Sequence, residues 1–120
     1  MKKHILVIDD DESIRKSLSR ILERNGYEVS TASDGLEGIT KFQGGGSVDL
    51  IIADIFMPNL DGIDVLLDLK TRNANVKIIS ISGREDFYLD ATKDLGAHCA
   101  LKKPFSNDEL LTAIKSLLPD

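Results

Sequence analysis

Cysteine is nearly absent from this chain: Cys99 is alone among 120 residues, so no internal disulfide can form. Long hydrophobic runs are also missing, since no apolar stretch approaches the roughly 20 residues that cross a bilayer. The apolar run that follows Lys2-Lys3 stops at Asp9, which is too early for a signal peptide. These absences argue against a disulfide scaffold and a membrane-spanning protein, and they favour the cytoplasm.

Acidic residues outnumber basic ones, with 20 Asp and Glu against 15 Lys and Arg. The net charge is −5, and no run of basic residues is longer than two. Neither nonspecific attraction to nucleic acid nor binding to an anionic membrane surface is therefore expected. The 42% hydrophobic and 29% charged content is ordinary for a globular domain. Because the chain shows no repeat and no linker, we expect residues 1–120 to form a single domain.

Short apolar runs alternate along the chain with longer segments of helical period. This alternation predicts an α/β fold, in which a parallel sheet carries helices on both faces. The predicted strands are residues 4–8, 27–32, 48–53, 76–81 and 97–101. The predicted helices are residues 13–24, a short helix after Asp34, residues 61–72, residues 84–95 and a last helix after Ser106.

Polar residues predict where three of these helices begin. Asp11 or Glu12 is expected to cap the first helix. Asp34 followed by Glu37, and Ser106 followed by Glu109, have the spacing of capping boxes. Each pattern therefore predicts a helix start.

Four of the predicted strands end at polar residues. Asp9 and Asp10 follow the first strand, Asp54 the third, Ser82 the fourth and Lys103 the fifth. The carboxyl ends of parallel strands form the ligand-binding edge of such sheets, so these side chains are expected to meet there. Three carboxylates carry −3 and Lys103 restores only +1, so the site needs a cation. Oxygen ligands with room for water suit Mg²⁺, with Mn²⁺ as the alternative.

The motifs at these strand ends resemble those of two-component response regulator receiver domains, especially the single-domain chemotaxis regulators. The resemblance spans essentially the whole chain. It implies a doubly wound, flavodoxin-like sheet of five strands in the order 2-1-3-4-5. The matching motifs are Ile8-Asp9-Asp10-Asp11, Asp54, Met57-Pro58-x-x-Asp61-Gly62, Ile81-Ser82-Gly83 and Lys103-Pro104-Phe105.

The resemblance implies a specific metal site. Asp10 and Asp54 would ligate Mg²⁺ directly, and Asp9 would act mainly through water. The backbone carbonyl of Phe56 would supply a third protein ligand.

The resemblance also assigns the chemistry. Asp54 would be the nucleophile and phosphorylation site, which accepts a phosphoryl group as an aspartyl phosphate. Lys103 would neutralise charge, and Ser82 would donate a hydrogen bond to a phosphoryl oxygen, with Gly83 leaving backbone room beside it. A cis peptide bond between Lys103 and Pro104 would aim the lysine inward.

The chain departs from the family pattern in its switch. Ala100 stands where these domains usually carry a rotating aromatic residue. Two outcomes stay open: Ser82 moves alone, or the readout uses Phe87, Tyr88 or His98.

Two further positions bear on the lifetime of the phosphorylated form. Phe56 is bulkier and less polar than usual for its position, and Arg84 lies on the other side of the site. Together they would hinder the approach of water, which predicts slow self-dephosphorylation.

The resemblance implies a cytoplasmic signalling switch rather than an enzyme that turns over a metabolite. Its expected partners are a sensor histidine kinase or phosphotransfer protein and a downstream protein target, and phosphorylation-dependent homodimerisation is an additional expectation. No direct contact with nucleic acid or membrane is expected. Whether the chain stands alone or is one domain of a longer protein stays open.

The sequence also bears on three rival functions. A phosphatase of the haloacid dehalogenase type needs an acid two residues after its nucleophile, and Phe56 stands there. A flavodoxin-like cofactor binder would need a phosphate-binding loop, where this chain has acids that repel phosphate. A receiver that binds partners without phosphorylation is favoured by Ala100 and disfavoured by the complete acid set.

Overall fold

The computed structural model describes residues 2–43, 47–55, 75–83 and 96–119, and the single positions 68, 71 and 93. The helices predicted over residues 61–72 and 84–95 lie almost wholly outside the described residues. The strands are β1 (His4–Ile8), β2 (Glu28–Ala32), β3 (Leu50–Asp54), β4 (Lys77–Ser82) and β5 (Cys99–Lys102). The helices are α1 (Glu12–Arg24), α2 (Gly35–Gln43) and α5 (Asn107–Leu117).

The strands form a five-stranded sheet in the order β2-β1-β3-β4-β5, and every neighbouring pair is parallel. This confirms the predicted fold class and strand order. The parallel registers bring the carboxyl ends of the strands to one edge: Ile8 pairs with both Ala32 and Ala53, and Asp54 pairs with Ile81. That edge positions the candidate site.

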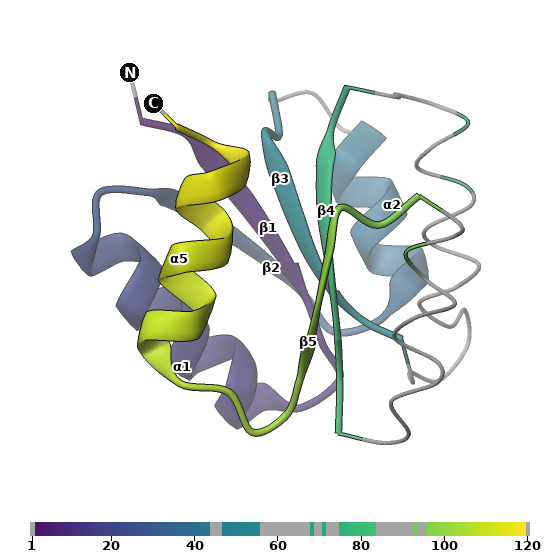
Figure 1. The fold of residues 1–120 in the computed structure, drawn as a ribbon. Helices are drawn as coiled ribbons and strands as arrows, with labels where there is room; N and C mark the ends of the chain where they lie inside the picture. The colour runs from purple at the N-terminus through teal and green to yellow at the C-terminus, as the bar shows by residue number, and fades with distance from the viewer. Residues whose placement is uncertain are drawn as a thin grey trace.

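Helices cover both faces of the sheet. Figure 1 shows α1 and α5 on one face and α2 on the other. Alternate residues of the central strands therefore enter two different cores. Ile5 and Val7 of β1 join the core under α1 and α5, whereas Leu6 and Ile8 join the core under α2. Within the described part of the chain, no helix is long and apolar enough to span a membrane.

The helix starts follow the predicted caps with one exception. The Asp11 side chain accepts hydrogen bonds from the backbone of Ser13 and Ile14, and Ser106 and Glu109 form a reciprocal capping box. At α2, Asp34 accepts from the backbone N–H of Glu37, but the Glu37 side chain bonds the N–H of Ser33 rather than that of Asp34. The box predicted there is therefore displaced by one residue.

Candidate functional site

Asp9 lies directly after β1, is fully buried, and has every polar group engaged. Its backbone N–H donates to the carbonyl of Ala32 at 3.1 Å. One carboxylate oxygen accepts from the backbone N–H of Asp11 at 2.9 Å, and the other accepts from Lys103 Nζ at 2.8 Å. Its carbonyl accepts from Arg15 Nη1 at 2.7 Å. Asp9 is thus held from four directions.

Asp10 and Asp54 complete the acidic cluster but differ in exposure. Asp54 is the last residue of β3 and only 6% exposed, so the strand itself carries this carboxylate to the edge. Asp10 is exposed to solvent. One carboxylate oxygen from each of Asp9, Asp10 and Asp54 lies within 4.8 Å of the others. Two buried acids beside an exposed one leave an open side for water, which is the arrangement Mg²⁺ favours.

Lys103 joins the two buried acids. Its Nζ lies 2.8 Å from Asp9 Oδ2 and 3.1 Å from Asp54 Oδ2. The Lys103–Pro104 peptide bond is cis, and the Lys103 backbone N–H donates to the carbonyl of Ser82 at 2.7 Å. Lys103, which follows β5, is therefore bonded to the residues at the ends of β1, β3 and β4.

Burial and charge act against each other at this site. Burial raises the pKa of Asp9, and the hydrogen bond from Lys103 offsets only part of that rise. Burial alone would lower the pKa of Lys103, but the hydrogen bond to Asp9 and the charge of Asp54 raise it overall. The lysine is thus held as a cation, while the ionised form of Asp9 is disfavoured. A bound divalent cation would stabilise the ionised form of Asp9 and so offset the free-energy cost of burying its charge.

Ser82 is the last residue of β4 and is completely buried beside the cluster. Gly83 is exposed, and a methyl group there would meet the Lys103 side chain at ordinary contact distances of 3.7 and 3.8 Å. Close packing therefore does not require glycine at this position. Ala100 pairs with Ser80 in the ladder, two residues before the Ser82–Lys102 pair.

His98 lies far from the candidate site. Its Nδ1 accepts a hydrogen bond from the backbone N–H of Ile78, near the beginning of β4, whereas Ser82 ends that strand. His98 is therefore not adjacent to Ser82, and its part in a readout stays a prediction. Phe56, Arg84, Phe87 and Tyr88 lie outside the described residues, so the predictions made for them stay predictions.

Arg15 is the site residue that the sequence did not reveal. In the sequence, Arg15 looks like an ordinary polar residue on the surface of α1. The structure shows that its guanidinium reaches the Asp9 carbonyl. The one signal in the sequence that could have pointed to Arg15 was its position, one helical turn after the Asp11 cap.

A family model described as the response regulator receiver domain matches residues 5–115. Among curated proteins, the chain is 40% identical over 119 residues to the alkaline phosphatase synthesis transcriptional regulatory protein PhoP of Bacillus subtilis, covering 98% of this chain and 49% of that protein. It is 37% identical to the response regulator MprA of Mycobacterium sp. strain KMS, covering 98% of this chain and 51% of that protein. The chain thus spans about half the length of these relatives.

Solved structures give the same result. A response regulator receiver domain protein from Clostridium thermocellum superposes with a TM-score of 0.92 at 34% identity, covering 98% of this chain and 94% of that one. TrrA from Thermotoga maritima, in complex with Mg²⁺ and BeF, superposes with a TM-score of 0.87 at 36% identity, covering 96% of this chain and 98% of that one.

Proposed function

Because this chain belongs to the response regulator receiver domain family, we propose that it is a phosphorylation-controlled switch that carries a phosphoryl group on Asp54. The observation that supports this most directly is the cluster of Asp9, Asp10 and Asp54, closed on its buried side by Lys103. Two buried acids that share one lysine are a costly arrangement for a purely structural role, because desolvating charges opposes folding. A site for phosphoryl transfer can use such an arrangement, because it needs a positioned nucleophile and balanced charge.

The donor set fits a divalent cation. Asp9, Asp10 and Asp54 are oxygen ligands on one edge of the sheet, and Mg²⁺ is the proposed ion, with Mn²⁺ as the alternative. When bound, the ion supplies positive charge against both the acids and the incoming phosphoryl group. The Phe56 carbonyl, which is the remaining ligand proposed from the family, lies outside the described residues.

Phosphoryl transfer asks this chain mainly for positioning and charge neutralisation. A carboxylate oxygen of Asp54 attacks the phosphorus of a phosphohistidine, so a P–O bond forms as the P–N bond to the imidazole breaks. Lys103, held at 3.1 Å from Asp54, balances negative charge as the acyl phosphate forms. The Ser82 hydroxyl, at the end of the adjacent strand, is the proposed donor to a phosphoryl oxygen.

The proposed donor is a sensor histidine kinase or a phosphotransfer protein, and the output is an altered surface for a downstream protein or a second receiver. The chain is proposed to promote only its own phosphorylation and dephosphorylation, in the cytoplasm. Slow loss of the phosphoryl group, attributed to Phe56 and Arg84, also remains a prediction.

The test is phosphorylation by acetyl phosphate or phosphoramidate, read by intact mass. We expect the wild type to gain one phosphoryl group with Mg²⁺ and none with EDTA. Asp54→Asn should gain none in either condition, because it removes the nucleophile. Asp108→Asn is the matched control, since it makes the same change at an exposed acid on α5 that is not a member of the cluster, and it should behave as the wild type.

Two results would contradict the proposal. Equal modification of wild type and Asp54→Asn would place the phosphoryl group elsewhere. A wild type that gains no mass from either donor, while remaining folded and able to bind Mg²⁺, would favour a receiver that recognises partners without phosphorylation. Turnover of a phosphate ester by the wild type would instead revive the phosphatase alternative.

A further inference from the structure

Arg15 fixes the peptide unit that connects two members of the acidic cluster. Its Nη1 donates to the carbonyl oxygen of Asp9 at 2.7 Å, and that carbonyl belongs to the peptide bond between Asp9 and Asp10. A peptide unit is planar, so holding the carbonyl also orients the N–H and Cα atom of the following residue. The guanidinium on α1 therefore sets the direction in which Asp10 leaves the strand end.

Asp10 depends on this support more than its neighbours do. The Asp9 carboxylate is held by Lys103 and by the Asp11 backbone, and Asp54 sits inside the β3–β4 ladder. No hydrogen bond or ion pair joins the exposed Asp10 carboxylate to any other residue that the structure describes. Its place in the cluster is therefore determined by its backbone.

We propose that Arg15 is a positioning residue for the cation site: by holding the Asp9 carbonyl, it preorganises Asp10 as a metal ligand. This inference rests on the proposed function, since it assumes that the acidic cluster binds a divalent cation. Residues that orient metal ligands commonly change affinity by about 10- to 100-fold when they are removed. An effect at the lower end is expected here, because one hydrogen bond is lost.

Whether Mg²⁺ affinity rises or falls when the Arg15 guanidinium is removed distinguishes a positioning role from a purely electrostatic one. A guanidinium near a cation site repels the incoming ion, so removing its charge alone would tighten Mg²⁺ binding. Loss of the backbone clamp has the opposite consequence, because Asp10 must then be ordered when the ion binds. A weaker affinity after removal of a positive charge would therefore identify the clamp.

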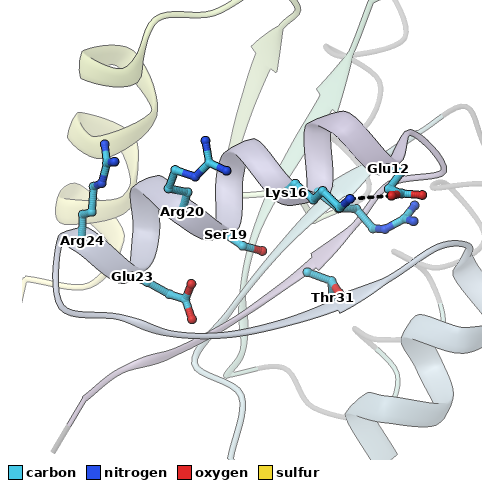
Figure 2. Close-up of a pocket in the computed structure, with 8 residues that line it drawn as sticks. Glu12, Lys16, Ser19, Arg20, Glu23, Arg24 and Thr31 are labelled. Atoms are coloured by element: carbon cyan, nitrogen blue, oxygen red, sulfur yellow. Dashed lines mark ion pairs between the residues drawn. The ribbon is translucent and has the colours of Figure 1, made fainter.

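The same helix provides a matched control. In Figure 2, Lys16 is paired with Glu12 near the start of α1, whereas Arg20 extends from the middle of the helix. Arg20 is exposed and, like Arg15, lines an open groove of about 800 Å³ along α1. Arg20→Gln thus removes the same charge from the same helix without touching the Asp9 carbonyl.

The experiment is a calorimetric titration of unphosphorylated protein with Mg²⁺, comparing wild type, Arg15→Gln, Arg15→Lys and Arg20→Gln. We expect Arg15→Gln to weaken binding by about tenfold. Arg15→Lys, which keeps the charge on a shorter side chain with a single donor group, should lose less affinity. Arg20→Gln should match the wild type or bind slightly more tightly. Far-ultraviolet circular dichroism verifies that each variant is folded.

An Arg15→Gln protein that binds Mg²⁺ as tightly as the wild type, or more tightly, overturns the inference. If Arg15→Gln does not fold, Arg15→Lys decides: weaker binding supports the clamp, and wild-type affinity overturns it. A wild type that binds no Mg²⁺ is a different result, because it removes the metal site of the proposed function itself.

Discussion

The acidic residues of the site occupy very different surroundings although they act on one edge of the sheet. Asp9 is fully buried with four hydrogen bonds, Asp54 is almost buried within the sheet, and Asp10 faces solvent. Burial raises the pKa of Asp9 because the charged form loses water that the protein only partly replaces. Ionisation of Asp9 therefore lowers the stability of the metal-free protein.

We predict that Asp9→Asn stabilises the metal-free protein at neutral pH. The raised pKa means that folded Asp9 holds its proton more tightly than unfolded Asp9, whose ordinary pKa is 3.8. The associated stability is present below that value and is lost as pH rises through the folded pKa. Asparagine does not titrate, so the advantage of the variant should widen with rising pH and then level off. Urea unfolding in EDTA, at a series of pH values, measures this.

Asp108→Asn is the control, because it makes the same substitution at an exposed acid on α5. A free energy of unfolding of Asp9→Asn that is lower than that of the wild type at neutral pH would contradict the prediction. It would mean that the Lys103 hydrogen bond outweighs the cost of burying the carboxylate.

The site residues that ended strands were predictable from sequence, and the one on a helix was not. Asp9, Asp54 and Ser82 each interrupt an apolar run, so both their chemistry and their place on the sheet edge follow from one pattern. Arg15 bonds a backbone carbonyl through its guanidinium. Because every residue has a backbone carbonyl, the sequence gives no indication of which one Arg15 contacts. His98 lies two residues from Ala100 in the chain, but its ring bonds Ile78, four residues before Ser82 on β4, so proximity in the chain alone does not place a residue at the site.

At the scale of elements, the sequence predicted the five strands and the three helices that the structure describes. It placed the start of β1 correctly, but it began each of the other four strands one or two residues too early. The third strand was predicted from residue 48, yet β3 begins at Leu50. Asp49 instead donates its N–H to the carbonyl of His4 and accepts the N–H of His4 on its side chain. Asp49 is therefore bonded to β1 although it precedes β3. The pattern of apolar residues cannot distinguish such a flanking residue from a residue of the strand itself.

The packing of α2 on β1 depends on a glycine within the helix. A Cβ atom at Gly38 would clash with Cδ1 of Ile8 and would lie 2.9 Å from its Cγ1, and the Ile8 side chain is fully buried. Helices normally disfavour glycine, by about 1 kcal/mol relative to alanine. Here the close approach of helix and strand explains its presence.

We predict that Gly38→Ala destabilises the protein despite its better helix propensity. Overpacking a buried site costs about 1–3 kcal/mol, which exceeds the propensity gain over most of that range. Chemical denaturation should therefore give a lower free energy of unfolding, by about 1 kcal/mol. Combining the change with Ile8→Val removes the nearest methyl group, so the double variant should be more stable than the sum of the two single changes.

Gly83→Ala is the matched control, because its new methyl group would meet Lys103 at ordinary contact distances. We expect its stability to change by no more than about 0.5 kcal/mol. If both glycine variants were equally stable, the close approach of α2 would not be what requires Gly38.

At the scale of the molecule, burial is concentrated in the middle of the sheet and falls toward its edges. Every residue of β3 is buried, and so are all residues of β4 after Lys77. In β5 three residues are half-buried and Lys102 is exposed, while β2 reaches full burial only at Ala32. The strand that leads to Lys103 is therefore held by fewer apolar contacts than the strand that carries Asp54.

We predict that native-state hydrogen exchange follows this gradient. The amides of β3 and β4 should exchange only through global unfolding, whereas those of β5 should exchange faster through local opening. Mg²⁺ binding should slow the β3 and β4 amides, because a ligand of the native state raises the free energy of global unfolding. Exchange through local openings that leave the metal site intact should not slow when Mg²⁺ binds.

If β5 amides respond to Mg²⁺ as strongly as β3 amides, opening of β5 must disrupt the site. In that case the Lys103 bonds to Asp9 and Asp54 would couple this edge strand to the metal. Protection of β5 equal to that of β3 without metal would contradict the gradient.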